Sequence, residues 1–304
     1  MSWFSLALSS AFSNSVVNVI DKIVVERYLR DRWSFPFFMA AFLGVYGVGL
    51  LAVRGALGWF RIPPAPVLAV ALLPGVLHYV SSVLYTRTLV LTDAATVAAI
   101  TQTAPLFAVV WGWLVFGELF RPLSYLGIVL SVCCSALLSM EQAPHARRRA
   151  LNPVLLMTLA STMLRSLGDL FIKVTLGGQD YWNTFGLSRA ALLPITGLLL
   201  LNREHRRLVA SALRAQGPVL LPGMAALELL AIVPLLLSTI AFALGPLGLV
   251  SAVRYTTPLF VLGMTGLLNG LRPGLVPEPG GRGHLLLRVL LTVGILAGVV
   301  MLRA

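Results

Sequence analysis

Apolar runs of about 18 to 25 residues recur along the whole chain, and each is long enough to cross roughly 30 Å of hydrocarbon as an α-helix. Of the 304 residues, 58% are hydrophobic and 11% are charged, so few polar side chains remain to cover a water-soluble surface. A helix also satisfies its own backbone hydrogen bonds, as a segment within lipid must. The sequence therefore predicts an all-α integral membrane protein.

Prolines, glycines and charges between the runs divide the chain into ten expected transmembrane helices. These cover residues 3–21, 35–53, 67–90, 94–116, 123–140, 153–174, 183–201, 217–243, 247–269 and 285–303. The basic stretch 143–152 lies at the midpoint of the chain. We expect it to link two five-helix halves, residues 1–142 and 153–304. The first run lacks a preceding basic segment, so we expect a retained helix rather than a cleaved signal peptide.

The two halves share a repeated segment. A shift of 153 residues places Val97–Phe107 on Val250–Phe260, with six identities in eleven positions. A shift of 151 places Lys22 on Lys173. Because five expected spans is an odd number, the halves should cross the membrane in opposite orientations. Inverted repeats of this kind are typical of transporters that work by alternating access, and they place a binding site between the halves.

Several short segments resemble a known family. Thr103–Phe107, followed by Leu114–Glu118 and the glycine-led helix from Leu126, is similar to the fourth and fifth helices of the EamA-type drug/metabolite transporter superfamily. Asn18–Lys22 looks like the end of that family's first helix. The resemblance extends over nearly the whole chain. It implies ten helices and solute transport, often export, without ATP hydrolysis.

The second half departs from the family pattern after its fourth expected helix. Leu271 stands where the first half has Glu118, and residues 273–283 form an insertion. A symmetrical role for Glu118 is therefore not expected. We interpret Glu118 as a residue of a helix end or of an interface between helices.

Two stripes of polar side chains inside the expected spans are the first candidates for a substrate site. Their members lie four residues apart: Asn14, Asn18 and Lys22 on the first span, and Arg165, Asp169 and Lys173 on the sixth. A charge near the bilayer centre costs roughly 2.5 to 3.5 kcal/mol on insertion scales, so such residues usually face a partner or an aqueous cavity. Since the two helices correspond under the repeat, we expect both stripes to face one central space. The alternative for the second stripe is a ladder of ion pairs along one helix.

Further candidates lie on the third, fourth and ninth spans. They can form hydrogen bonds or carry charge: His78, Ser82, Tyr85, Gln102, Arg254 and Tyr255. The first three share one helix face, and the others precede Pro105 or Pro258, which free a backbone carbonyl one turn earlier. For His78, a neutral histidine bonded to a neighbouring helix is an equal alternative. Arg189 and Glu228 are expected to pair or to snorkel.

The sequence contains no signature of catalysis or cofactor binding. It has no P-loop, no metal-spaced His/Glu pair and no Gly-x-Ser-x-Gly, and Cys133 and Cys134 lie inside an apolar run. We therefore expect a non-enzymatic protein without cofactor or metal. The net charge of +12 comes from basic residues that flank apolar runs, so nucleic acid is not an expected partner. Membrane lipids and a small-molecule or lipid-linked substrate are expected partners.

Small residues recur every fourth position on the fifth and tenth spans, as in Gly127 and Ser131 and in Gly294 and Gly298. Faces of this kind allow helices to approach closely. We expect them to serve packing within the fold or contacts in a homodimer, so the chain is expected to be a monomer or a homodimer.

The distribution of Lys and Arg and the family resemblance give different orientations. Fifteen of the 23 basic residues flank loops after odd-numbered spans, which by the positive-inside rule places those loops in the cytoplasm and both termini outside. Proteins of the resembling family are generally drawn with both termini inside. Both orientations stay open, and the expected location is a bacterial inner (plasma) membrane.

Intramembrane cations exceed acids in the expected spans. The sequence therefore predicts a secondary transporter that moves a small metabolite, anionic by hypothesis, by alternating access. One alternative is a translocator of a polyprenyl-phosphate-linked or other anionic lipid. Another is a scaffold or sensor without transport, which the number of buried charges and the lack of a soluble output domain disfavour.

Overall fold

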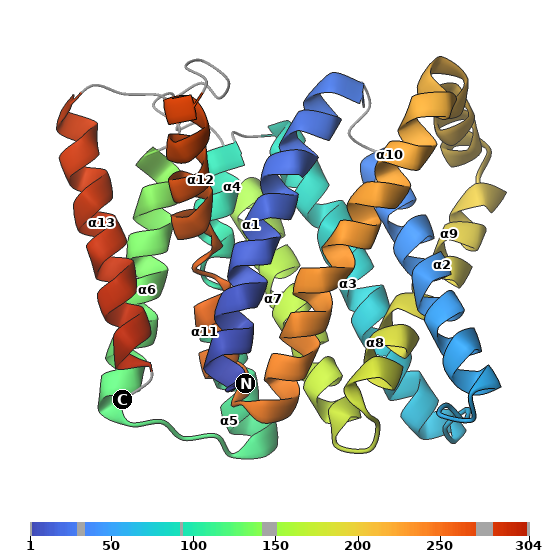
Figure 1. Cartoon of the computed structure of the whole chain (residues 1–304), viewed down its shortest axis with the longest axis horizontal. Helices are drawn as coiled ribbons and strands as arrows, with labels where there is room; N and C mark the ends of the chain where they lie inside the picture. The colour runs from blue at the N-terminus through green and yellow to red at the C-terminus, as the bar shows by residue number, and fades with distance from the viewer. Residues whose placement is uncertain (1, 29–33, 92–93, 142–150, 272–281, 303–304) are drawn as a thin grey trace.

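Every regular element in the computed structural model is an α-helix within the ranges that it describes, residues 2–28, 34–91, 94–141, 151–271 and 282–302. In chain order the helices are α1 (Trp3–Tyr28), α2 (Ser34–Ala56), α3 (Ala65–Leu91), α4 (Ala94–Thr101), α5 (Ala104–Phe116), α6 (Pro122–Glu141), α7 (Leu151–Leu176), α8 (Tyr181–Ala190), α9 (Leu192–Leu201), α10 (Arg203–Leu244), α11 (Leu247–Arg254), α12 (Thr257–Leu271) and α13 (Arg282–Met301). They stand side by side as an elongated bundle (Figure 1). The expected linker 143–152 and insertion 273–283 lie largely outside the described residues.

The helices are long and apolar enough for a membrane protein. Eight stretches in the described residues meet the length and hydropathy of a membrane span. α6 and α13 contribute shorter apolar stretches, Pro122–Leu138 and Leu287–Met301, at the expected fifth and tenth spans. The all-α membrane class is therefore confirmed, while the count of ten membrane crossings stays a prediction.

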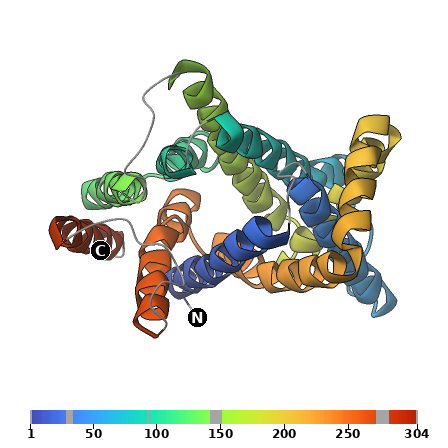
Figure 2. The same cartoon turned by 90° about the horizontal axis from the view of Figure 1, so that it is seen from above.

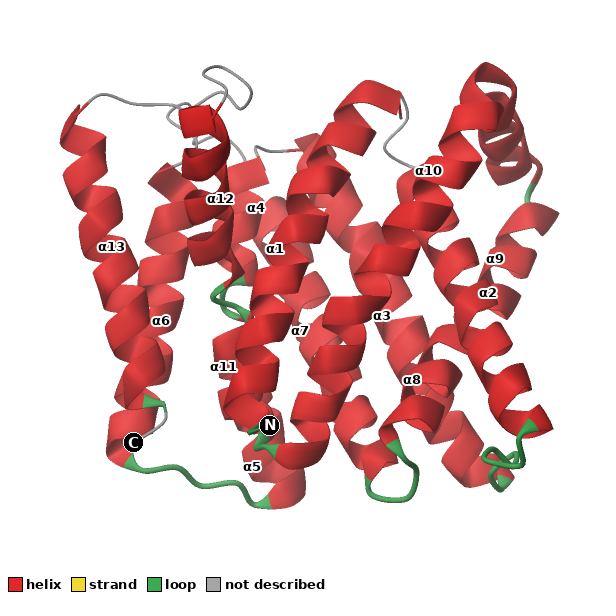
Figure 3. Ribbon diagram, in the orientation of Figure 1, coloured by secondary structure: helices red, strands yellow, loops and turns green. Residues whose placement is uncertain are grey.

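Three expected spans are each divided into two helices (Figure 3). The expected spans 94–116, 183–201 and 247–269 become α4–α5, α8–α9 and α11–α12. In each case a proline lies in the first turn of the second helix: Pro105, Pro194 and Pro258. Proline has no backbone N–H and disfavours a helical conformation for the residue before it. The prolines therefore end the preceding helices.

Two helices extend beyond the apolar runs that predicted them. α1 continues to Tyr28, and α10 begins at Arg203 instead of residue 217. The Asn202 side chain accepts a hydrogen bond from the Glu204 backbone N–H over 2.9 Å, which caps α10 at its start. Both extensions are rich in charged residues, so hydrophobicity alone did not reveal them.

The breaks in the fourth and ninth spans fall at equivalent positions. α4 ends at Thr101 and α5 begins at Ala104, whereas α11 ends at Arg254 and α12 begins at Thr257. Adding the repeat shift of 153 to the first two numbers gives the second two. The repeated sequence therefore has the same local structure in both halves.

Helices of the first half pack mainly against helices of the second half. The main pairs are α1 with α10, α3 with α7, α2 with α8, α5 with α11 and α6 with α13, and Figure 2 shows the two sets interleaved when viewed from above. If α1 corresponds to α7 and α3 to α10, the first two pairs are equivalent to each other. The pairs α2–α8 and α6–α13 each join two corresponding helices, and α5–α11 joins the second helix of one broken span to the first helix of its counterpart.

Two pairs of helices, α1 with α7 and α2 with α8, run in opposite directions. Trp3, at the start of α1, lies against Gly245, and Lys173, near the end of α7, donates a hydrogen bond to the Gly245 carbonyl over 2.8 Å. The last turn of α2 likewise meets the residue before α8, because Arg54 Nη2 lies 2.8 Å from Asp180 Oδ2. The start of one helix thus meets the end of its counterpart in both cases.

The small residues of α6 and α13 pack these two helices together. A Cβ atom added to Gly127 would lie 2.7 Å from the Gly298 carbonyl oxygen, and one added to Gly294 would lie 2.5 Å from Cys134 Sγ. Such contacts are too close for any side chain. The predicted role of these faces in packing within the fold is confirmed, and a role in a dimer stays a prediction.

Candidate functional site

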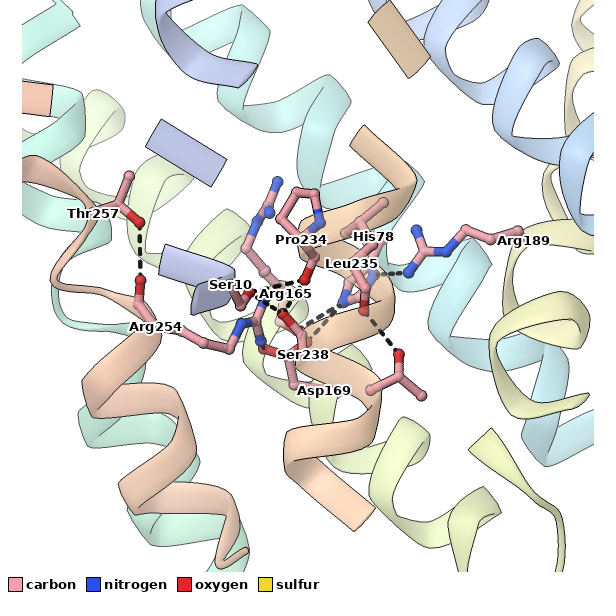
Figure 4. A network of polar contacts seen from close by, with 11 residues as sticks. Ser10, His78, Arg165, Asp169, Arg189, Pro234, Leu235, Ser238, Arg254 and Thr257 are labelled. Atoms are coloured by element: carbon pink, nitrogen blue, oxygen red, sulfur yellow. Dashed lines mark hydrogen bonds and ion pairs between the residues drawn. The ribbon is translucent and has the colours of Figure 1, made fainter. Parts of the chain in front are cut away.

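Asp169, in the second half of α7, lies at the centre of a polar cluster inside the bundle (Figure 4). Only 2% of this residue is exposed. Arg254 Nη1, from α11, donates a hydrogen bond to Asp169 Oδ2 over 3.0 Å. His78 Nε2, from α3, lies 3.5 Å from Asp169 Oδ1. One carboxylate therefore joins three helices, of which α3 belongs to the first half and α7 and α11 to the second.

Local structure explains how two of these partners reach the carboxylate. Arg254 is the last residue of α11, where a cation is favoured by the partial negative charge of the helix C-terminus. Its guanidinium also lies 5.1 Å from the centre of the Phe242 ring, a favourable position for a cation. On α7, a Cβ atom added to Gly168 would lie 2.5 Å from His78 Nε2, so only glycine leaves room for the imidazole.

His78 extends the cluster toward α8. Its Nδ1 lies 3.4 Å from Arg189 Nη2, and its Nε2 lies 3.2 Å from the Arg165 carbonyl oxygen. A guanidinium can only donate, so Nδ1 accepts and the ring proton belongs on Nε2, facing Asp169 and the carbonyl of Arg165. His78 is therefore bonded to neighbouring helices, as one of the two sequence hypotheses stated. A role in binding substrate stays a prediction.

Arg189 is a member of the cluster that the sequence did not assign to a binding site. The residue is 5% exposed, and its Nε atom has no hydrogen-bond partner among the described residues. Its guanidinium lies 5.7 Å from the centre of the Phe185 ring and within electrostatic range of Asp169 and Glu228. Arg189 points into the bundle and does not snorkel. The sequence showed an arginine in the middle of an apolar run, but it did not indicate whether the side chain points into the bundle or toward the membrane surface.

Arg165 lies one turn before Asp169 on α7 and has an exposed side chain. Its guanidinium extends away from the Asp169 carboxylate (Figure 4). It makes no ion pair with any residue that the structure describes. It does lie within electrostatic range of Tyr85 and Tyr255. The cluster therefore presents one cation that is available to a ligand.

Lys173 belongs to a second polar group, at the end of α7 where α1 begins. Lys173 Nζ lies 2.5 Å from Glu118 Oε1 and 2.8 Å from the Gly245 carbonyl oxygen. The two Glu118 oxygens accept from the Leu247 backbone N–H over 3.0 and 2.9 Å. Glu118 thus caps the positive end of α11 while it pairs with α7. We call Glu118, Lys173, Gly245 and Leu247 the Glu118 clasp.

The ion pairs of Asp169 and Lys173 test two separate hypotheses that were drawn from the sequence. The ion-pair ladder along α7 is wrong, because Asp169 pairs with Arg254 and His78 while Lys173 pairs with Glu118. Partners on other helices approach more closely than neighbours four residues along α7. The interpretation of Glu118 as a residue of a helix interface is confirmed.

The remaining predicted residues are less closely tied to Asp169. Gln102 is 7% exposed, its Oε1 has no partner among the described residues, and it lines the same narrow gap between helices as Tyr255. Ser82 is half-buried on α3. Asn14 is half-buried and Asn18 is exposed, and within the described part of the chain no hydrogen bond joins either to α7. Lys22 lies in α1, but its side chain is outside the described residues.

The described residues contain no group of three or more His, Cys, Asp or Glu side chains placed to hold a metal ion. The two cysteines are unpaired. The polar interior contains the Asp169 and Glu228 carboxylates together with guanidiniums, an imidazole, hydroxyls and amides.

The bundle and its polar interior define a helical membrane protein. The model of the EamA-like transporter family matches residues 1–140. A solved crystal structure of a protein with no stated function superposes with a TM-score of 0.66, at 16% sequence identity and with 98% of each chain covered. That likeness shows a shared fold over both halves. No curated protein matches the sequence.

Proposed function

We propose that this protein is a secondary transporter that moves a small anionic metabolite across a bacterial inner (plasma) membrane by alternating access. The observation that carries this proposal is the balance of charge around Asp169. Three guanidiniums, those of Arg165, Arg189 and Arg254, lie around this carboxylate, with Glu228 in range of Arg189. Cations therefore exceed acids in the cluster.

Arg165 is the group that an anionic substrate would neutralise. Arg254 already pairs with Asp169, whereas Arg165 has no ion pair in the described part of the chain. An unpaired cation at membrane depth is costly unless an anion or water reaches it. A carboxylate or phosphate matches the two parallel N–H groups of a guanidinium. Tyr85 and Tyr255 can supply further hydrogen bonds to the bound solute.

Alternating access is supported by the relation between the two halves. The helices α1 and α7, and likewise α2 and α8, run in opposite directions, and the broken spans have equivalent break positions. We propose that these halves are inverted repeats and that they rock around the Asp169 cluster. The Glu118 clasp closes the end where α1 begins, since it ties the segment after α5 in one half to α7 and α11 of the other. The described conformation is then one that is closed at the clasp.

Counterflow in proteoliposomes tests the proposal. Vesicles loaded with one unlabelled organic anion, either a carboxylate or a phosphate ester, should take up the same labelled anion when they contain the protein. Uncharged solutes of similar size should not exchange. The matched variants are Arg165→Gln and Arg206→Gln, of which the second removes an exposed arginine outside the cluster.

Two results would overturn the proposal. If the Arg165→Gln variant exchanges anions as fast as the unchanged protein, the cluster does not bind the substrate. If no anion exchanges at all, the substrate is not an anion of these classes. A lipid-scrambling assay on the same vesicles tests the alternative of lipid translocation. Scrambling without solute exchange would replace the proposed function.

A further inference from the structure

A groove separate from the Asp169 cluster lies at the opposite end of the molecule from the Glu118 clasp. Its lining residues come from the start of α2, the second half of α3 and the start of α10, and Figure 1 shows these parts of the ribbon toward the upper edge. The groove is shallow: its enclosed part has a volume of about 60 Å³, and the space that includes the open mouth is about 500 Å³. Arg87 and His205 line it together with an apolar wall that includes Phe37, Val83 and Leu208.

The two kinds of lining side chain are separated along the groove. Tyr79, Val83 and Arg87 lie one turn apart on α3, with Arg87 nearest the helix end. His205 lies in the first turn of α10, and Leu208 follows one turn later. Arg87 and His205 are exposed and therefore lie at the mouth, whereas Phe37 is buried and Val83 and Leu208 are half-buried. The apolar residues lie deeper.

The start of α10 has the pattern of a helix at a membrane surface. Its outward face carries four exposed arginines against one glutamate: Arg203, Arg206, Arg207, Arg214 and Glu204. Its inward face, which includes Val209 and Leu213, packs against the cluster around Phe37 and Phe38. Basic amphipathic segments of this kind attract anionic lipid headgroups.

We propose that the groove binds an anionic phospholipid of the surrounding bilayer, which stays bound and is not transported. Arg87 and His205 hold the phosphate at the mouth, and an acyl chain covers the apolar wall of Phe37, Val83 and Leu208. A free phosphate would leave that wall uncovered. A headgroup that also carries an ammonium would be repelled by the arginines on the adjacent turn of α10.

Arg87 also has a contact within the protein. The proposal is compatible with that contact, because a guanidinium has five N–H donors and can bind two partners. His205 is exposed, so its ring is open to a ligand. The groove is independent of the transported solute, and its test does not use transport as the readout.

Retention of lipid by the purified full-length protein tests the site. The protein in detergent is mixed with phosphatidylglycerol or with phosphatidylcholine of the same acyl chains, washed at raised ionic strength to screen exposed charges, and analysed by native mass spectrometry. We expect preferential retention of phosphatidylglycerol. The double variant R87Q/H205Q should lower it about fivefold for the lost arginine charge. The matched control Arg214→Gln, an exposed arginine that does not line the groove, should retain it.

A second variant blocks the groove without changing charge. Val83→Trp should fill the space of the acyl chain and reduce retention while the protein remains monodisperse and inserted. Unchanged retention in that variant, equal retention of the two lipids, or an equal loss in R214Q and R87Q/H205Q would each overturn the proposal. Complete displacement of the lipid by inorganic phosphate would instead identify a site for a free anion, and would overturn it as well.

Discussion

The Arg254 guanidinium donates a hydrogen bond to Asp169 Oδ2 over 3.0 Å, at the point where α11 ends and the backbone breaks before α12. His78 approaches the other carboxylate oxygen from α3. A break in a transmembrane helix is therefore tied through one acidic side chain to both halves of the molecule. Movement of one half against the other would have to change the surroundings of Asp169.

Asp169→Asn should destabilise the protein and abolish transport. The amide cannot neutralise Arg254, and removal of one partner from a buried ion pair typically costs about 3 kcal/mol or more. Thermal unfolding in detergent, followed by intrinsic fluorescence, measures the loss of stability. The double variant Asp169→Asn with Arg254→Gln should recover part of it, because the unpaired cation is removed as well.

Asp180→Asn is the matched control for that substitution. Asp180 pairs with Arg54 at a surface position, with 42% of its side chain exposed, and it caps α8 by accepting a hydrogen bond from the Asn183 N–H. Asparagine caps a helix about as well as aspartate, and surface ion pairs contribute about 1 kcal/mol or less. Equal destabilisation by the two substitutions would contradict the central role of Asp169.

Arg165→Gln should weaken transport of an anion without lowering stability. A hydrogen bond to a charged group contributes about 1.5 to 3 kcal/mol, so kcat/KM for uptake should fall about tenfold to a hundredfold. Arg165→Lys keeps the charge but loses the pair of parallel N–H donors, so its kcat/KM should lie between those of the unchanged protein and the Arg165→Gln variant. Initial rates of labelled anion uptake measure the effect, with Arg206→Gln as the control. A larger loss in the Lys variant than in the Gln variant would argue against an anionic substrate.

Two glycines should respond to the same substitution with opposite signs. Gly298 faces Ser131 and the Gly127 carbonyl across the α6–α13 contact, whereas Gly263 on α12 has no atom within 4 Å of an added Cβ. Gly298→Ala should destabilise, since overpacking typically costs about 1 to 3 kcal/mol. Gly263→Ala should be neutral or stabilise by up to about 1 kcal/mol through helix propensity. Thermal unfolding of the two variants gives the comparison, and a shift of both in the same direction would contradict it.

Much of the fold could be predicted from hydrophobicity and repetition. The apolar runs located the helices, and the repeat at 97–107 and 250–260 related the two halves. The expected spans 94–116 and 247–269 were continuous, whereas the structure breaks both before a proline, which disfavours a helical conformation for the preceding residue. The start of α10 could not be predicted in this way. Its first turns are charged and are stabilised by the cap at Asn202 and by packing on Phe37, which no hydropathy pattern records.

The polar interior could be predicted only in part. Spacing placed Asp169 among the candidates, but it could not indicate that Arg254 and His78, distant in sequence, supply its partners. Arg189 was not predicted as a member of the site, because the face of α8 that points inward depends on the packing of α8 against α2 and α3. The α7 ladder failed for a related reason, since Lys173 finds Glu118 from another helix. Spacing along one helix predicts only contacts within that helix, whereas buried charged side chains can pair with residues on any helix of the bundle.

Glu118→Gln should open the end of the molecule that the Glu118 clasp closes. The amide can still accept from the Leu247 N–H, but it loses the charge that attracts Lys173, and a loss of about 1.4 kcal/mol shifts a two-state equilibrium about tenfold. Leu247 is fully buried. A cysteine at this position, in a chain with Cys133 and Cys134 replaced by serine, should therefore react with a membrane-impermeant maleimide about tenfold faster in the Glu118→Gln variant.

Glu204→Gln, at an exposed position on α10, should leave the rate unchanged. Because Leu271 replaces the acid in the second half, we expect no equivalent effect at the opposite end, and equal labelling with and without Glu118 would show that the clasp does not control access.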